Sequence, residues 1–195
     1  MITKNEILNL PEGKFNATVD MYEEKDRSTF EEIYTSWRIL SNQLDAIGAR
    51  KVNLPDGLSE CGFCYFFNLW RTNYGIAGAQ HSSFDAYDPA TGNRIQIKGG
   101  SVETDLTSFG PESVWDVLYF VDFFKEGKWD YTFDVYLIPN NDIYNQKVNK
   151  SQTFKEQQLQ GRRPRFSIKK EIISAKGIKP LYTCNIKTGE LIKHS

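Results

Sequence analysis

The sequence lacks several features that would place the protein in a membrane, a secretory pathway or a metal-cluster class. Its 195 residues include only three cysteines and two histidines, and an odd count with one Cys-x-x-Cys and no second pair or His partner is weak evidence for zinc or redox chemistry. The one Cys-x-x-Cys pair, Cys61 and Cys64, lies in an apolar stretch typical of a helix with buried thiols. No apolar run is long enough to span a bilayer, and the polar N-terminus lacks a signal core. We expect a cytoplasmic protein with no membrane partner and no organic cofactor.

A surplus of either charge is also missing, because the formal net charge is −1. That total hides an asymmetry. Residues 1–146 hold 12 Lys/Arg and 22 Asp/Glu, a net of −10, whereas residues 147–195 hold 12 Lys/Arg and 3 Asp/Glu, a net of +9. Such a division predicts that the basic part faces a polyanion. A solvated, lysine-rich tail is the alternative that charge alone leaves open.

The order of predicted elements favours a mixed α/β class. Helices are expected over 28–48, with Ser28 and Glu31 as a capping box, and from about residue 56 to 71. Strand patterns follow at residues 83–88, 94–98, 117–124 and 133–139, with another possible at 181–186. Short helices are possible at 140–150 and 168–175. Helices before and after the strands predict an α/β (α+β) fold with a mixed central sheet flanked by helices.

The first two strands predict a hairpin that carries polar groups. Pro89-Ala-Thr-Gly-Asn93 is turn chemistry. The alternation in the second strand lets Ile95 and Ile97 bury into the core, while Gln96 and Lys98 face a cleft or solvent. Asp85 then lies across from the Gln96–Lys98 end of that strand. A carboxylate, an amide oxygen and an ammonium group suit metal-assisted phosphodiester hydrolysis. An ordinary exposed hairpin is the competing interpretation of the spacing.

These residues resemble a known active-site signature. Asp85 followed by Gln96-Ile97-Lys98 is similar to the motif of the PD-(D/E)xK nucleases, and further blocks resemble one small group of type II restriction endonucleases, which cleave the interrupted palindrome GC-N-GC. The similar blocks cover most of the chain after residue 50: Asn53-Leu-Pro-Asp-Gly-Leu-Ser-Glu60, Phe84-Asp-Ala-Tyr-Asp88, Arg94-Ile-Gln-Ile-Lys98, Asp105-Leu-Thr-Ser-Phe-Gly-Pro111 and Gln160-Gly-Arg-Arg-Pro-Arg-Phe-Ser167.

The resemblance implies a restriction-endonuclease-like core, Mg²⁺ as cofactor, and roles for named residues. Asp85 would be the central metal ligand, the Ile97 main-chain carbonyl or the Gln96 side chain would supply a further oxygen, and Lys98 would position or activate the attacking water. Glu60 matches a helix-borne acid in many such nucleases, although it could equally be an exposed helix residue. Gln96 departs from the signature, which expects an acid there.

Other residues remain as rivals or helpers at this point. Asp88 competes with Asp85 for the metal role, Glu103 and Asp105 are acids within reach, and His81 could assist the chemistry. The absence of an acid at position 96 leaves a second metal in doubt and makes Glu60 more important.

The basic segment suits double-stranded DNA. Eight cations lie between residues 147 and 170, opposed only by Glu156, so the segment can neutralise phosphates. Arginine can read guanine in the major groove with two hydrogen bonds. We expect residues 157–165 to read bases and the lysines to meet phosphate. The candidate DNA-binding residues are Ser108, Lys155, Gln158, Gln160, Arg162, Arg163, Arg165 and Lys169.

These expectations combine into one hypothesis with two alternatives. The chain is expected to be a single endonuclease domain over 1–195, with a catalytic core at about 53–140 and a basic recognition region at about 147–170. A palindromic target implies a two-fold symmetric homodimer. The alternatives are a repair or junction-resolving nuclease of the same fold and a catalytically inactive, sequence-specific DNA-binding protein.

Overall fold

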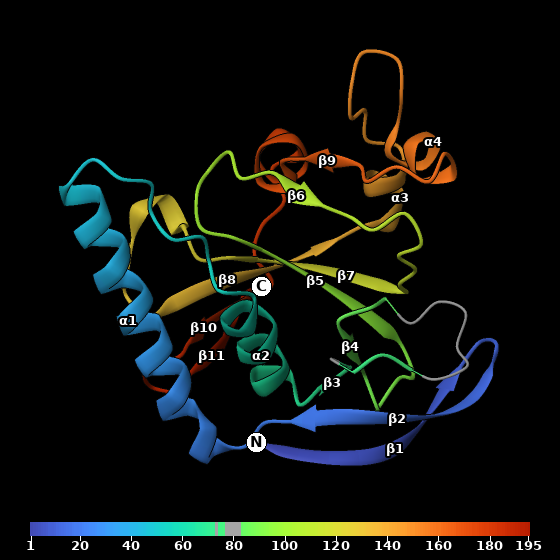
Figure 1. Cartoon of the computed structure of the whole chain (residues 1–195), viewed down its shortest axis with the longest axis horizontal. Helices are drawn as coiled ribbons and strands as arrows, with labels where there is room; N and C mark the ends of the chain where they lie inside the picture. Colours follow the sequence, from blue (N-terminus) through green and yellow to red (C-terminus); the bar gives the residue numbers. More distant parts are fainter. Residues whose placement is uncertain (73, 77–82) are drawn as a thin grey trace.

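The computed structural model describes residues 1–72, 74–76 and 83–195 and contains one large mixed sheet (Figure 1). Nine strands lie in the order β1-β2-β3-β4-β5-β7-β8-β10-β11. Within the described residues, β5 and β7 are the parallel neighbours and the other pairs are antiparallel. The strands are β1 (Ile2–Leu10), β2 (Gly13–Met21), β3 (Trp70–Arg71), β4 (Ala86–Tyr87), β5 (Arg94–Gly100), β7 (Val117–Asp122), β8 (Thr132–Ile138), β10 (Tyr182–Asn185) and β11 (Leu191–Lys193).

Helices pack on both faces of this sheet. The helices α1 (Arg27–Ala46) and α2 (Asp56–Phe67) bury their apolar side chains on one face, with Ile95 and Ile97 of β5. The other face is covered by α3 (Asn140–Tyr144), α4 (Phe154–Leu159) and a π-helical turn, Lys169–Ser174. A small second sheet, β6 (Thr107–Ser108) with β9 (Arg165–Phe166), lies on this second face. The mixed sheet flanked by helices confirms the predicted fold class.

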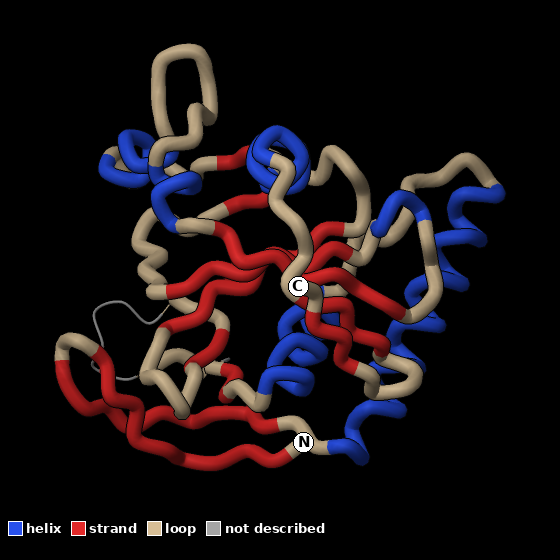
Figure 2. Tube along the Cα trace, turned by 180° about the vertical axis from the view of Figure 1, so that it is seen from behind, coloured by secondary structure: helices blue, strands red, loops and turns tan. Residues whose placement is uncertain are grey.

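The N-terminal hairpin is the largest element that we did not predict from the sequence. β1 and β2 pair in full register from Ile2↔Met21 to Leu10↔Gly13 and extend one edge of the sheet, which Figure 2 shows from behind as a long two-stranded ribbon. A third apolar cluster joins the hairpin to Phe84 and Tyr87, beside the predicted hairpin. The hairpin therefore supports the segment that carries Asp85.

The predicted elements differ from the observed ones mainly at their ends. α1 begins after Asp26 and no side chain caps it, so the expected Ser28–Glu31 capping box is absent. α2 stops at Phe67 rather than at about residue 71 because Asn68 adopts a left-handed conformation with φ of 52°. The four residues thereby freed include Trp70 and Arg71, which form β3 and pair with β4. No helix among the described residues is long and apolar enough to cross a membrane.

Candidate active site and nucleic-acid interface

The candidate active site lies where β4 stops pairing with β5. The predicted hairpin is confirmed, with Ala86 opposite Ile95 and Tyr87 opposite Arg94. Asp85 comes just before β4, and its N–H donates to the Ile95 carbonyl at 3.0 Å. Its carboxylate Oδ2 then accepts the Ile97 N–H at 2.7 Å and a hydrogen bond from the Gln96 side-chain amide. One carboxylate therefore occupies the edge of β5 that β4 leaves open.

Gln96 is buried, which corrects the expectation that its side chain faces a cleft or solvent. Its exposed fraction is 2%, because β6 and the second apolar cluster cover that face of the sheet. The amide nitrogen of Gln96 is used by Asp85, while its amide oxygen is buried with no hydrogen-bond partner among the described residues. Buried polar atoms nearly always have a partner, so this oxygen has spare capacity for a ligand.

A close approach of α2 to β5 brings Glu60 to the same edge. A Cβ added at Gly99 would lie 2.9 Å from both Leu54 and Ser59, so only glycine lets the first turns of α2 rest on this strand. Glu60 follows Ser59 directly. Its carboxylate Oε2 accepts two hydrogen bonds from Arg71, from Nε at 3.1 Å and from Nη2 at 2.7 Å. The second carboxylate oxygen, Oε1, makes no hydrogen bond within the described residues.

Arg71 is a residue that the sequence analysis missed. It lies on β3, eleven residues after Glu60 and across the sheet from Ala86. The sequence did not indicate a strand at Arg71, because the predicted helix continued to about residue 71 and placed Arg71 on the same element as Glu60. The observed strand instead makes Arg71 a partner that fixes the orientation of the Glu60 carboxylate.

A polar pocket joins the two acids. It has a volume of about 400 Å³ and is lined by Asp56, Glu60, Arg71, Thr72, Gly75, Ser83, Phe84 and Asp85. Thr72 holds its rim in place: its N–H donates to the Asp85 carbonyl at 3.1 Å and its hydroxyl donates to the Phe84 carbonyl at 2.8 Å. Both acids thus open onto one space large enough for a hydrated ion and a phosphate group.

The Asp85 carboxylate is buried, and its positive and hydrogen-bonding neighbours do not fully offset the cost of burying its charge. The pKa of Asp85 is raised to about 6: burial is the largest cause and the Glu60 carboxylate adds to the rise, whereas Lys98 and the two hydrogen bonds oppose it. Asp85 therefore lies close enough to Glu60 and Lys98 to feel the charge of both. A bound cation would favour the ionised form of Asp85.

The donor set fits a hard divalent cation. Carboxylate and amide oxygens are the ligands that Mg²⁺ and Ca²⁺ prefer. Asp56, Glu60 and Asp85 line the pocket, and the unpartnered oxygen of Gln96 belongs to the side chain whose amide donates to Asp85. In the described part of the chain no three His, Cys, Asp or Glu side chains cluster as a metal site.

Lys98 connects this site to the basic segment. Its ammonium Nζ lies 5.5 Å from the ring centre of Phe109, which directly follows β6. β6 pairs with β9, placing Ser108 opposite Arg165, and the Phe109 N–H donates to the Pro164 carbonyl at 3.2 Å. Two candidate DNA-binding residues, distant in sequence, thus lie opposite each other near β5.

The remaining acids that rivalled Asp85 are placed elsewhere. Both oxygens of Asp88 are used inside the turn, one accepting from the Ala90 N–H at 2.9 Å and the other from the Thr91 hydroxyl at 2.7 Å. Glu103 and Asp105 lie exposed in the segment after β5. His81 falls outside the described residues. The geometry therefore favours Asp85 over Asp88.

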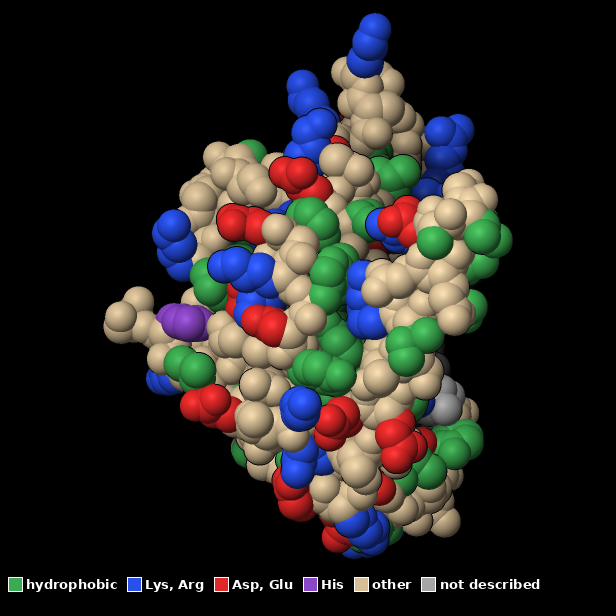
Figure 3. Space-filling view, turned by 90° about the vertical axis from the view of Figure 1, so that its left-hand side faces the viewer, with side chains coloured by type: hydrophobic (Ala, Val, Ile, Leu, Met, Phe, Trp, Pro, Cys, Tyr) green, Lys and Arg blue, Asp and Glu red, His purple; other side chains and the backbone are tan. Residues whose placement is uncertain are grey.

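Most cations of the basic segment are exposed and form no ion pair with a described residue. Figure 3 shows Lys and Arg side chains projecting from the top of the molecule, where this segment lies. Lys155, Arg162, Arg163 and Arg165 are exposed and form no ion pair with any described residue. These side chains are available to a polyanion.

The other members of the candidate interface are more constrained. Gln158 donates to the Ser113 carbonyl at 3.0 Å, and the Gln160 side-chain oxygen accepts from Gln152 at 3.0 Å. Lys169 is held apart from the exposed cations, since its ammonium lies 2.6 Å from the buried Asp122 carboxylate. Its position indicates an internal ion pair that anchors the π-helical turn.

A mixed sheet flanked by helices, with the Asp85 and Glu60 carboxylates on one pocket beside β5, is consistent with a restriction-endonuclease-like fold. A family model described as Bsp6I restriction endonuclease matches residues 22–175. The chain belongs to this Bsp6I restriction endonuclease family. Membership implies double-stranded DNA as the partner and a divalent metal as the cofactor.

Among curated proteins, the chain is similar to the type II restriction enzyme Bsp6I of Bacillus sp. (strain RFL6). The two are 34% identical over 172 residues, which cover 86% of this chain and 94% of that enzyme. No solved structure matches the chain.

Proposed function

We propose that the protein is a Mg²⁺-dependent type II restriction endonuclease that cleaves double-stranded DNA at GC-N-GC or a closely related interrupted palindrome. The observation that carries this proposal is the Asp85 carboxylate at the open edge of β5, hydrogen-bonded to Gln96 and the Ile97 N–H and facing the pocket that also contains Glu60. Family membership supports the reaction class. The GC-N-GC target rests on the resemblance of the sequence blocks.

Each side chain at the strand edge has a role in this proposal. Asp85, Glu60 and the Gln96 amide oxygen hold the metal, with the Ile97 main-chain carbonyl as a further oxygen on the same stretch of strand. Arg71 keeps one oxygen of Glu60 occupied and leaves the other for the metal. Lys98, held beside Phe109, orients the attacking water and accepts or redirects its proton. Mg²⁺, when bound, polarises the scissile phosphate and lowers the pKa of that water.

Recognition is assigned to the basic segment and to β6. Arg162, Arg163 and Arg165 are exposed and form no ion pair with a described residue, and arginine matches the O6 and N7 acceptors of guanine. Ser108 lies opposite Arg165 on the paired strands, so the recognition segment ends next to the proposed catalytic strand.

A palindromic site would be matched by a two-fold homodimer in which each subunit cuts one strand. The proposed place of action is the cytoplasm.

Plasmid digestion tests the proposal directly. Purified protein is incubated with DNA containing mapped GC-N-GC sites in Mg²⁺ or EDTA, and the fragment ends are sequenced. The expected result is cutting only with Mg²⁺ and only at these sites. Asp85→Asn should abolish cutting, whereas Asp88→Asn, which alters only the turn, should retain it.

The same assay separates the alternatives. Preference for branched over linear DNA would select a repair or junction-resolving nuclease. Sequence-specific binding without cutting at any Mg²⁺ concentration, together with no heat of Mg²⁺ binding, would select an inactive DNA-binding protein. Retained cutting in Asp85→Asn would transfer the metal role to another acid.

A further inference from the structure

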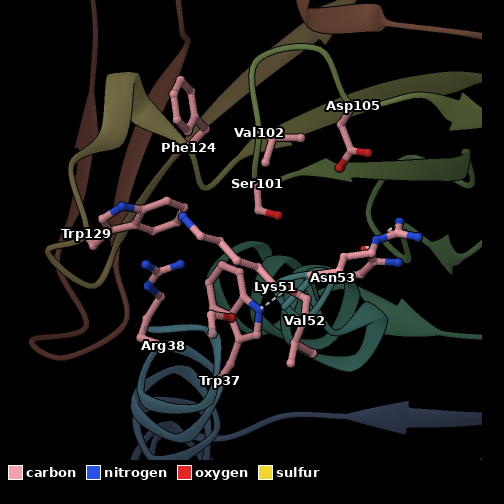
Figure 4. Close-up of a pocket in the computed structure, with 12 residues that line it drawn as sticks. Trp37, Arg38, Lys51, Val52, Asn53, Ser101, Val102, Asp105, Phe124 and Trp129 are labelled. Atoms are coloured by element: carbon pink, nitrogen blue, oxygen red, sulfur yellow. Dashed lines mark hydrogen bonds between the residues drawn. The ribbon is translucent and has the colours of Figure 1, made fainter. Parts of the chain in front are cut away.

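A second pocket lies at the opposite end of β5 from the turn. Its volume is about 420 Å³, within the range of roughly 300–1,000 Å³ that small-molecule sites occupy. The C-terminal half of α1, the segment before α2, the segment after β5 and the segment after β7 build it (Figure 4). Ser101, on its wall, is three residues beyond Lys98, or about 10 Å of extended strand. The pocket is therefore a neighbour of the catalytic strand and distinct from the Asp85 pocket.

The lining combines aromatic surfaces with an excess of positive charge. Trp37, Phe124 and Trp129 supply flat apolar walls, while Arg38, Arg50 and Lys51 share the lining with a single acid, Asp105. Lys51 is already paired at 3.1 Å with Asp45, outside the lining, so the positive charge without an ion pair among the described residues is that of Arg38 and Arg50. Figure 4 shows Arg38 and Lys51 both pointing toward Trp129. The Arg38 guanidinium lies 3.5 Å from the centre of the Trp129 ring and forms no ion pair with a described residue.

Two polar groups in this lining have no partner among the residues that the structure describes. The Ser41 hydroxyl is buried without a hydrogen bond in a residue that is 1% exposed, and the Arg38 Nε is buried and equally unpaired. Trp37 differs, because its indole N–H already donates to the Val52 carbonyl at 3.0 Å. Since buried donors and acceptors normally find partners, the Ser41 hydroxyl and the Arg38 Nε indicate a polar ligand that enters between aromatic walls.

We propose that this pocket binds a nucleotide, with the base against the tryptophans and the phosphate near the cations. A simple anion would leave the aromatic walls unused, and an apolar ligand would cover the cations without pairing them. Bases stack on aromatic side chains and on arginine, and arginine pairs well with phosphate. The ligand is either a nucleotide of the DNA substrate, which would have to leave the base stack, or a free mononucleotide. The first source rests on the proposed function.

Titration with mononucleotides tests the pocket without any cleavage. The intrinsic fluorescence of the full-length protein is followed as dAMP, deoxyadenosine or inorganic phosphate is added. Saturable quenching by dAMP at lower concentration than by either fragment is expected. Arg38→Gln should weaken dAMP binding about tenfold, the scale of one hydrogen bond to a charged group, and Ser41→Ala should weaken it less. Lys14→Gln, an exposed charge on the N-terminal hairpin, is the matched control.

A second arm identifies the source. Asp85→Asn protein is mixed with duplexes that carry 2-aminopurine at successive positions of the target site. A fluorescence rise at one position that disappears in the Asp85→Asn, Arg38→Gln double variant assigns the pocket to a DNA nucleotide. This assignment holds whether or not free dAMP binds. Binding of dAMP with no responding position assigns it to a free mononucleotide. If neither signal appears, or if both persist in Arg38→Gln protein whose thermal unfolding is unchanged, the proposal is wrong. Loss of cleavage alone would bear on the proposed function and not on this pocket.

Discussion

Charged groups are arranged differently at the edge of β5 beside Asp85 and in the basic segment (residues 147–170). At the edge, charged groups are partly buried and face partners: Glu60 is bound by Arg71, and Asp85 lies in the field of Lys98. In the basic segment, four exposed cations meet no acid among the described residues. Paired, oriented charges suit chemistry at a fixed point, whereas unpaired charges suit attraction of a polyanion. The two regions should therefore respond differently to substitution.

The largest effect is expected from Lys98→Gln. Removing the ammonium that acts on the water should lower the single-turnover cleavage rate by about 10²–10⁴-fold, the usual range for a general acid or base, with little change in DNA affinity. Cleavage is measured on saturating DNA and binding by gel shift in Ca²⁺. An equal loss in Lys155→Gln, which changes only an exposed cation, would contradict the distinction between the regions.

Arg71→Gln should have the next largest effect. Freed from its two hydrogen bonds, the Glu60 carboxylate loses its fixed orientation, and partners of metal ligands typically contribute about 10–100-fold in metal affinity or activity. Raising the Mg²⁺ concentration should restore part of the rate, which a general folding defect would not allow. Calorimetry with Ca²⁺ measures the affinity directly, and an unchanged affinity would remove Arg71 from the site.

The basic segment should show its contribution in salt dependence. Replacing Lys150 and Lys155, two exposed lysines that form no ion pair with a described residue, by Gln should reduce the slope of log affinity against log salt by about one for each DNA phosphate that the protein no longer neutralises. The cleavage rate of fully bound DNA should stay the same. Lys14→Gln is the control for charge alone and should leave the slope unaltered.

The smallest effect concerns pH and the metal-free protein. The pKa of Asp85 is about 6 in the folded state and about 3.9 in an unfolded chain, so the folded state binds the extra proton between these values. Stability should therefore be highest below about pH 4 for this group and fall as pH rises to about 6. Calorimetric melting in EDTA should show this fall, and Asp85→Asn should remove its contribution.

Local sequence was enough to predict the hairpin, because the turn residues 89–93 and the alternating residues 94–98 lie in one short continuous segment. The same spacing placed Asp85 opposite Gln96, as observed. The family resemblance, rather than periodicity, supplied the chemical meaning. Which acid binds metal and which cations touch DNA remain predictions.

What escaped the sequence depends on contacts between distant segments. The burial of Gln96 is caused by β6 and the apolar cluster beyond it, and the pairing of Ser108 with Arg165 joins strands of two residues each. Arg71 was missed because a left-handed Asn68 ends α2 early. The N-terminal hairpin did have a local signal, since Pro11-Glu12-Gly13 separates two alternating runs.

Gly99 has a consequence for how this protein can evolve. A methyl group there would collide with Leu54 and Ser59. The close spacing between α2 and β5 therefore depends on the lack of a side chain at position 99. Alanine is a single nucleotide change away, yet it would move the helix that carries Glu60. The exposed positions of the basic segment carry no such steric constraint from described residues, whereas a larger side chain at position 99 would disturb the proposed metal site.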